Sequence, residues 1–409
     1  MNSERLLDRF LSYVRIDSMA REGAGSYPSS PGQLELGTKL VAELRAMGLP
    51  DARANQFGIV LATIPATVAG RAPTIALNAH LDTSPETTAA GVNPQVVRNY
   101  AGGDVVLGGG AGGVIRVADN PALSALHGRT LITTDGSTLL GADDKAGVAV
   151  IMETAHWLVE HPEIPHGPIR ICFTCDEEIG HGVDHIDLEE LGAVVAYTLD
   201  GQGANEIDVE TFSADVVIVR VRGVNIHPSI AKGRMVNAVR VAGEFLASLP
   251  RALSPEATAD RAGFLHPYTL AGGVAEVTFR VLLRDFETTR LNELATLLHK
   301  IAADCEREHP GARIELERVT QYRNMREGLL AEPRAVAFAE QALRRLGRTP
   351  IRTIVRGGTD GSRLTEIGLP TPNLSVGQHN PHSPLEWACL EEMVAAGEML
   401  VELAQVWAR

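Results

Sequence analysis

Histidine and carboxylate side chains cluster at five places in the sequence, each at the end of an apolar segment. The first cluster is "NAHLD", in which His80 and Asp82 follow the apolar residues of "TIAL". In open α/β sheets, ligands and catalytic groups gather at the carboxyl ends of the strands. We therefore expect the five clusters to meet at one edge of a sheet. The other four clusters are Asp143 with Asp144, Asp176 with Glu177 and Glu178, Asp200 alone, and His379 with His382.

This concentration of acidic residues predicts a metal centre. Buried carboxylates at one edge would repel each other unless a cation compensates their charge. A mixture of histidine and carboxylate suits zinc, cobalt or manganese better than the all-oxygen cage that calcium prefers. Because the donors outnumber those that a single zinc ion needs, we expect two metals that share a bridging carboxylate, as in hydrolytic sites. Calcium held by loop carboxylates is the alternative, and the histidines count against it.

The spacing within the clusters also suggests roles. Residues two apart on a strand share a face, so His80 and Asp82 are expected on the same side. A metal-binding imidazole usually donates its other N–H to a carboxylate, and Asp82 is well placed to accept it. Glu177 and Glu178 can divide two tasks, since one can bind metal while the other accepts a proton from metal-bound water. We expect Asp176 to cap the strand end.

The elements that must position these residues alternate between strand and helix. Strands are predicted at 74–82, 167–178 and 193–201. A helix is predicted at 143–162, because this segment starts with acidic residues and ends at a proline. This alternation is typical of an α/β domain with helices on both faces of a mostly parallel sheet.

The character of the chain changes near residue 212. Strand and helix patterns follow in the order β-α-β-β-α-β, the split βαβ or ferredoxin-like arrangement of a small α+β domain. We therefore expect a discontinuous catalytic domain at 1–211 and 322–409, with a smaller domain inserted at 212–321.

Length and composition exclude several classes of function. A chain of 409 residues favours two domains over one. Its formal net charge of −14 argues against non-specific binding to nucleic acid or to an anionic membrane. The N-terminal segment carries charges through its apolar pattern, which predicts an amphipathic helix and not a signal peptide. Without a signal peptide, a reduced cytoplasm is the expected setting for the four cysteines.

Two short motifs match known sites only superficially. Cys172 and Cys175 form a C-x-x-C, but inside a predicted strand they would face opposite ways, which disfavours a redox or zinc pair. Gly108, Gly110 and Gly113 match G-x-G-x-x-G. The dinucleotide motif requires a helix after the glycines, and "VIRVADNP" is not one. We expect a loop there.

Several longer motifs together resemble the peptidase T family of tripeptide aminopeptidases. This family is a branch of a larger group of dinuclear zinc hydrolases that includes carboxypeptidase G, the succinyl-diaminopimelate desuccinylases and the aminoacylases. The resemblance extends over essentially the whole chain. The motifs that carry it are "HLDTSPE", "TLITTDGSTLLGADDKAG", "YTLDG", "GVNIHPSIAKGRMVNA", "LLRDFE" and "RGGTDGS".

The resemblance implies a role for each clustered residue. Glu177 would be the general base that activates the bridging water, and then the acid that protonates the leaving amine. Asp82 would orient His80. The peptide bond between Asp143 and Asp144 would be cis. The implied metal ligands are His80 and Asp200 for one ion, Glu178 and His382 for the other, and Asp143 as the bridge between them.

The resemblance further implies that the inserted domain is a lid and a dimerisation domain. His227 would reach the partner's active site and stabilise the oxyanion, while Asn237 and Arg284 would face the substrate. Arg356 would bind the C-terminal carboxylate of a tripeptide, since arginine pairs with carboxylates in a bidentate manner. The alternatives are a plain loop histidine for His227, pairing with Asp285 or a neighbouring strand for Arg284, and an ordinary glycine-rich helix entry around Arg356.

The last ligand departs from the family pattern. The family has an aromatic residue before this histidine and a glycine after it, whereas here Pro381 precedes His382 and Ser383 follows it. His379 is a rival ligand three residues earlier. We favour His382 because it matches the family's asparagine-x-histidine pattern.

The implied activity is release of the N-terminal residue from tripeptides, with water held between two zinc ions and a glutamate base. Cobalt or manganese could substitute for zinc, and a homodimer is expected. The alternatives within the family are a dipeptidase, a carboxypeptidase and an N-acyl amino-acid deacylase. A catalytically silent peptide binder is the alternative from another class.

Overall fold

The computed structural model describes residues 1–70, 72–108 and 113–409. These residues form two compact units, each with its own hydrophobic core. Arg356, which we expected in the larger domain, lies in the second unit. The first unit comprises Met1–Val209, Met325–Thr353 and Thr359–Arg409, and the second comprises Glu210–Asn324 and Ile354–Gly358.

Four parallel strands form the centre of the large sheet in the first unit. In spatial order they are β8 (Ile169–Thr174), β3 (Ile75–His80), β9 (Val195–Gln202) and β16 (Asn373–His379). Every residue of β3 and β16 is buried, as expected for parallel strands that are covered on both faces. The predicted α/β class is confirmed.

Other strands flank this parallel centre and are joined to β8 and β16 by antiparallel pairing. These strands lack the long apolar runs of the centre, and the sequence patterns did not predict most of them. On the β8 side lie β2 (Val60–Ile64) and β1 (Arg53–Ala54). Beyond β16 lie β17 (Trp387–Cys389), β7 (Leu131–Thr133) and β4 (Gln95–Val97), and β10 (Glu206–Thr211) pairs with β16 and β15 (Ile351–Val355). A separate two-stranded sheet is formed by β5 (Val105–Val106) and β6 (Val114–Ile115).

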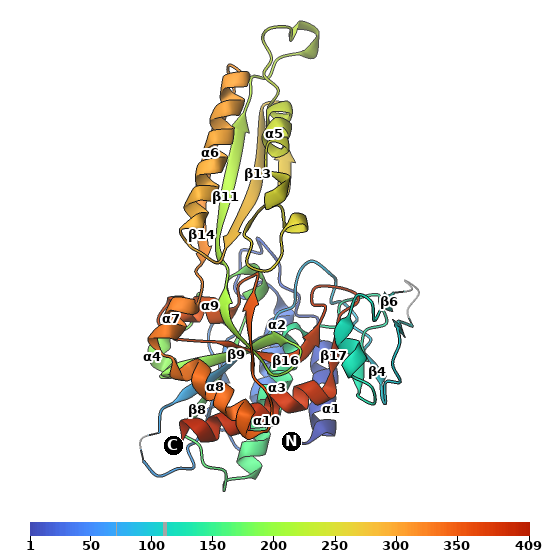
Figure 1. Ribbon diagram of the computed structural model, residues 1–409, viewed down its shortest axis with the longest axis vertical. Coiled ribbons are helices and arrows are strands. Elements are labelled where there is room, and N and C mark those ends of the chain that lie inside the picture. Colours follow the sequence, from blue (N-terminus) through green and yellow to red (C-terminus); the bar gives the residue numbers. More distant parts are fainter. Residues whose placement is uncertain (71, 109–112) are drawn as a thin grey trace. The chain divides into compact units, whose positions relative to one another are not determined.

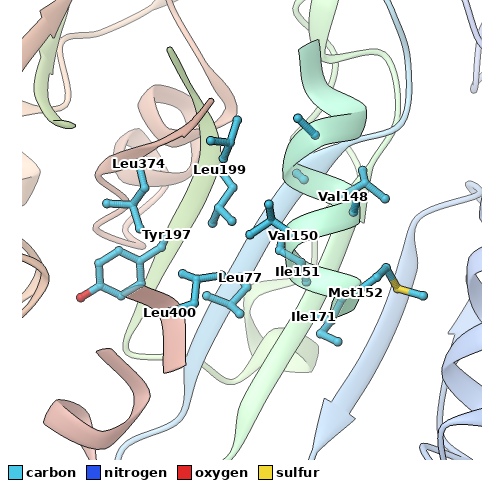
Figure 2. Packing of buried hydrophobic residues seen from close by; sticks show 14 of the residues in the cluster. Leu77, Val148, Val150, Ile151, Met152, Ile171, Tyr197, Leu199, Leu374 and Leu400 are labelled. Carbon is cyan, nitrogen blue, oxygen red and sulfur yellow. The ribbon is translucent and has the colours of Figure 1, made fainter. Parts of the chain in front are cut away.

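Both faces of the sheet are covered by apolar side chains. Helix α3 (Ala142–Glu160) is buried along most of its length and packs against β3, β9 and β16. Figure 2 shows its residues Val150 and Ile151 beside Leu77 of β3. The next residue back along β3, Ala76, belongs to the cluster on the opposite face. Alternate residues of one strand therefore build two apolar layers, as the period of a strand requires.

The remaining helices complete these layers. Among the described residues, no helix combines the length and hydropathy of a membrane span. The helices of the first unit besides α3 are α1 (Ser3–Val14), α2 (Pro31–Ala46), α4 (Leu188–Leu191), α7 (Arg326–Ala331), α8 (Arg334–Arg345), α9 (Asp360–Glu366) and α10 (Leu390–Trp407).

The second unit is a four-stranded antiparallel sheet with two helices (Figure 1). Its elements follow in the order β-α-β-β-α-β, and the spatial strand order is β12-β13-β11-β14. Helices α5 and α6 share one apolar cluster with the inward residues of the strands. The elements are β11 (Ser213–Arg222), α5 (Ala238–Ala247), β12 (Phe264–Gly272), β13 (Glu276–Asp285), α6 (Arg290–Glu308) and β14 (Arg313–Tyr322).

The two superficial motifs have structural explanations. Cys172 and Cys175 are free and buried, and they belong to clusters on opposite faces of the sheet. Gly113 is followed by strand β6, and no helix follows it within the described residues up to 120. Gly110 lies outside the described residues.

Candidate metal centre

The carboxyl ends of the parallel strands bring the predicted side chains together. His80 is the last residue of β3, and Asp200 lies near the end of β9. Glu177 and Glu178 begin a short 3-10 turn directly after β8. His382 follows β16. These segments are far apart in the sequence, but parallel strands end at the same edge of a sheet, so their side chains can meet there.

Asp143 lies between the two histidines. Its Oδ1 is 3.0 Å from Nε2 of His80, and its Oδ2 is 3.3 Å from Nε2 of His382. On the His382 side, Nε2 of this histidine is 2.9 Å from Oε2 of Glu178. On the His80 side, Nε2 is 4.0 Å from Oδ1 of Asp200. One carboxylate thus contacts two half-sites, each with a histidine and a further carboxylate.

The ligand atoms are close enough to hold cations. Two overlapping groups have their ligand atoms within 4.8 Å of one another: His80, Asp143 and Glu178, and His80, Asp144 and Asp200. In each group a nitrogen donor is mixed with carboxylate oxygens, which suits zinc and similar ions.

His379 is directed elsewhere. Its Nε2 lies 2.8 Å from Oε2 of Glu392, and its ring stacks on Trp387 with centroids 3.8 Å apart. His382 is therefore the histidine of this loop that faces the carboxylates. Its Nδ1 is 3.2 Å from Oε2 of Glu86, a residue of the "HLDTSPE" segment.

Asp82 supports the centre from behind. Its Oδ1 lies 3.4 Å from Nδ1 of His80, whose ring nitrogen is also 3.2 Å from the Asp82 carbonyl oxygen. The same carboxylate accepts hydrogen bonds from the backbone N–H groups of Glu177 and Glu178, at 3.1 and 3.0 Å. Asp82 consequently fixes both the histidine ring and the turn that carries the two glutamates.

Burial makes three of the carboxylates reluctant to ionise, whereas His382 and His80 outweigh the burial of Asp143 and lower its pKa. Burial raises the pKa of Glu177 and of Asp200 well above their usual values, and neighbouring carboxylates add to the effect. Burial also raises the pKa of Glu178 to about 7. Such shifts are the expected response of several acids that share a small buried volume.

The histidines show the complementary shift. Burial lowers the pKa of His382, but hydrogen bonds to Asp143 and Glu178 outweigh it and raise the value to about 12. His80 is likewise raised well above its usual pKa, because Asp143 and Asp82 outweigh its burial. The carboxylates around both imidazoles therefore favour positive charge at this place. A bound metal cation would supply such a charge.

Two buried carboxylate oxygens lack hydrogen-bond partners among the described residues and could bind a cation at this place. Oε1 of Glu178 and Oδ1 of Asp144 are buried and make no hydrogen bond within the described part of the chain. Buried polar atoms are normally paired, and a missing ion is one explanation for those that are not. The other oxygen of Asp144 accepts from the His80 backbone N–H at 3.0 Å. The peptide bond between Asp143 and Asp144 is cis, as the resemblance implied.

Three acidic residues have contacts that the sequence patterns did not reveal. Asp176, expected as a strand-end cap, is buried and accepts from the backbone N–H and hydroxyl of Ser29, at 2.7 and 2.5 Å. Asp360 is buried and accepts from the Thr174 hydroxyl, and burial raises its pKa to about 6. Glu386 is buried and accepts backbone hydrogen bonds from the segment that leads to Asp143. Its one signal is its place in "HSPLEW", four residues after His382.

Two predicted residues of the second unit precede helix α5 in the sequence. His227 is exposed and accepts from the backbone N–H of Ser229 at 3.2 Å, at the start of a short 3-10 turn. Asn237 caps α5, because its side chain accepts from the Val239 backbone N–H at 2.9 Å. Asparagine directly before an apolar-periodic segment is a typical N-cap signal.

Two predicted arginines are anchored within the second unit. Arg284 donates to the Tyr322 hydroxyl and lies over the Tyr322 ring, with its guanidinium carbon 5.2 Å from the centroid. Arg356 donates to the carbonyl oxygens of Asp260 and Ala262, at 2.8 and 2.9 Å. Its other terminal nitrogen donates to the Thr258 hydroxyl at 2.8 Å.

Comparison with known families identifies the group to which this arrangement is similar. Residues 135–406 match the profile of Peptidase family M20/M25/M40. The chain is 41% identical over 404 residues to a protein named Peptidase T from Geobacillus kaustophilus (strain HTA426), covering 99% of this chain and 98% of that protein. Peptidase T from Listeria monocytogenes serotype 4b (strain F2365) is also 41% identical over 404 residues, with the same coverage.

Solved structures share the fold. The aminopeptidase PepT from Bacillus cereus ATCC 10987 superimposes with a TM-score of 0.74 at 24% identity, covering 100% of both chains. A dinuclear metal-binding peptidase of the M20 family from Bacillus subtilis superimposes with a TM-score of 0.64 at 16% identity, covering 99% of this chain and 98% of that one.

Proposed function

Because the chain belongs to Peptidase family M20/M25/M40, we propose that it is a metal-dependent aminopeptidase that releases the N-terminal residue from tripeptides. The observation that carries this proposal is the position of Asp143 between His80 and His382, in a chain that matches proteins named Peptidase T over nearly its full length. The family supports peptide-bond hydrolysis, and the name of these relatives supports the narrower substrate.

We assign the ligands from the geometry around Asp143. His80 and Asp200 would hold one ion, Glu178 and His382 would hold the other, and Asp143 would contact both. Zinc suits this mixed nitrogen and oxygen donor set, and cobalt or manganese are reasonable substitutes. The unpaired buried oxygen of Glu178 supports the assignment.

Glu177 is the proposed general base. Its Oε2 lies 4.0 Å from Nε2 of His80, and its backbone N–H is held by Asp82. When bound, the metal ions would polarise the scissile carbonyl and make water a stronger nucleophile at neutral pH. Glu177 would accept a proton from the attacking water and then donate it to the leaving amine. A buried carboxylate with a raised pKa is suited to hold a proton between these two steps.

The second unit is the proposed lid and dimerisation domain. His227 would stabilise the oxyanion in the partner's active site, and its exposure leaves it available for such a contact. Arg356 would bind the C-terminal carboxylate of the tripeptide, and Asn237 and Arg284 would contact the substrate. We also propose that the protein is a homodimer. A cytoplasmic location is consistent with its four free cysteines.

Hydrolysis of Met-Gly-Gly tests this function. We expect release of methionine and Gly-Gly, loss of activity on chelation and recovery with zinc or cobalt. N-acetylated Met-Gly-Gly and Met-Gly serve as comparison substrates. Cleavage of the acetylated peptide would indicate a deacylase, release of C-terminal glycine from Met-Gly-Gly would indicate a carboxypeptidase, and a preference for Met-Gly would indicate a dipeptidase. Metal binding without turnover would indicate a silent peptide binder.

A further inference from the structure

Glu386 is a buried acid that touches the backbone next to the candidate centre. Glu386 is only 1% exposed. Oε2 accepts from the backbone N–H groups of Leu140 and Gly141, both at 2.7 Å, and Oε1 accepts from the N–H of Asp143 at 3.0 Å. One carboxylate thereby binds three amides of a four-residue segment.

Leu140 and Gly141 directly precede helix α3, and Asp143 lies in its first turn, so these amides need an acceptor from outside the helix. The first N–H groups of a helix lack partners within the helix, and an N-cap side chain usually accepts from them. The N-cap of α3 is Gly141, which has no side chain and adopts a positive φ of 79°. Asp143 is itself non-helical, with φ −81° and ψ 105°. Glu386 supplies the missing acceptor from a distant segment.

Backbone hydrogen bonds offset only part of the cost of burying the Glu386 carboxyl group, whose pKa burial still raises to about 7. A buried ionised carboxylate is costly unless it is paired or hydrogen-bonded. Hydrogen bonds from N–H groups to a charged acceptor are stronger than those between neutral groups. The ammonium of the fully buried Lys145 lies near enough to interact with this carboxylate, while it donates to the carbonyl oxygen of Ile16 at 2.7 Å.

The contact joins two segments that each carry a proposed ligand. Asp143 ends the segment whose amides Glu386 binds, and His382 lies four residues before Glu386. Oδ2 of Asp143 and Nε2 of His382 are 3.3 Å apart. Loss of the contact would leave the two ligands on segments that are no longer tied to each other at this point.

We propose that Glu386 is a positioning residue for the metal centre, which holds Asp143 and His382 so that both can bind the same ion. This inference rests on the proposed function, since it concerns the proposed ligands. Groups that orient metal ligands typically change metal affinity about 10–100-fold when removed. We expect a loss of this size for the ion bound by Asp143, Glu178 and His382, and a smaller effect on the ion bound by His80 and Asp200.

The substitution Glu386→Gln tests the proposal in the full-length protein. Glutamine keeps the size of the side chain but turns an NH₂ group toward backbone N–H donors. The matched control is Glu153→Gln. Glu153 is also fully buried on α3, and it pairs with Arg5 and Arg9 of the first helix at 2.7 and 2.6 Å. Both variants lose a buried carboxylate, but only Glu386→Gln loses the hydrogen bonds to the segment 140–143.

The readouts are the dissociation constants of the two bound Zn²⁺ or Co²⁺ ions by chelator competition, the visible spectrum of the cobalt form and the Tm. We expect Glu386→Gln to weaken one ion about 10–100-fold and to change the cobalt spectrum. We expect Glu153→Gln to lower the Tm without changing either constant. Equal stability losses with unchanged metal binding in both variants would overturn the proposal.

Two further outcomes would also test the proposal: a Glu386→Gln variant that does not fold, and a wild-type protein that binds no metal. If Glu386→Gln does not fold, Glu386→Asp keeps the charge but withdraws it by one methylene group, and it should weaken the same ion to a smaller extent. Unchanged metal binding by Glu386→Asp would then overturn the inference. If the wild-type protein itself binds no metal, the proposed metal centre is wrong, and the inference about Glu386 is overturned with it.

Discussion

The Nε2 atom of His382 lies 2.9 Å from Oε2 of Glu178, although 204 positions separate the two residues in the sequence. The other ring nitrogen of His382 faces Glu86 at 3.2 Å. One nitrogen of this imidazole is thus directed to the centre while a carboxylate lies beside the other, the arrangement common to metal-binding histidines. His379, only three residues away, pairs with Glu392 on a different side.

The contrast between these two histidines gives the first prediction. His382→Ala removes a proposed ligand, so we expect loss of one metal ion and a fall in kcat of more than about 100-fold, since loss of a mere supporting partner costs about 10–100-fold. His379→Ala removes a stack on Trp387 and a pairing with Glu392, so it should lower the Tm and keep both ions. Metal content by atomic emission and steady-state kinetics separate the two variants, and loss of metal in His379→Ala instead would reverse the assignment.

The adjacent glutamates give the second prediction. Glu177→Gln should keep both metal ions and lower kcat by about 10²–10⁴-fold, the usual contribution of a general base. Glu178→Gln should lose metal, because its Oε2 contacts His382 at 2.9 Å. Metal titration and kcat measured on the same preparations distinguish the two variants. A Glu177→Gln enzyme with near wild-type kcat would exclude this residue as the base.

The sequence predicted that these side chains would gather because most of them lie at or just after the end of an apolar strand, whereas Asp143 lies in the first turn of helix α3. His80 and Asp200 end or nearly end apolar strands, and the parallel order of those strands brings them to one edge. The choice between His379 and His382 required the family pattern, since strand periodicity cannot say which way a loop residue points after β16 ends.

Other contacts left no periodic signal. Glu386 accepts from backbone amides of a segment more than 240 residues earlier, and backbone donors are the same for every residue type except proline. Asn237 illustrates the opposite case. Its place before an apolar-periodic segment is a recognised N-cap signal, and the structure gives it that task. A local rule would thus have identified this cap, although we expected Asn237 to face the substrate, whereas the long-range backbone contact of Glu386 required the fold.

The third prediction concerns the stability of the metal-free protein. The folded-state pKa of Glu178 and of Glu386 is raised to about 7, so each binds a proton in the folded state at pH values where the unfolded chain has lost it. The free energy of unfolding should therefore fall as the pH rises from about 4.5 to about 7. The raised pKa of His382 acts in the same direction above about 6.5.

Bound metal should reverse this trend, because ligands bind metal in their deprotonated form and metal affinity grows with pH. Denaturant unfolding at several pH values, with and without zinc, measures the difference. Contributions from histidines remote from the centre are common to both forms and cancel. A metal-free protein that gains stability over this range relative to the metal-bound form would contradict the proposed environment of the carboxylates.

The last prediction concerns Arg356 and the substrate's C-terminus. If the guanidinium binds the tripeptide carboxylate, amidation of Met-Gly-Gly should lower kcat/KM of the wild type about 10–100-fold, the value of a hydrogen bond to a charged group. Arg356→Ala should lower kcat/KM for the free acid by a similar factor and barely distinguish the acid from the amide. Arg356 also donates to the carbonyls of Asp260 and Ala262, so the Tm of the variant must be measured beside its kinetics. A variant that still discriminates between acid and amide as the wild type does would assign the carboxylate pocket to another residue, whatever its stability.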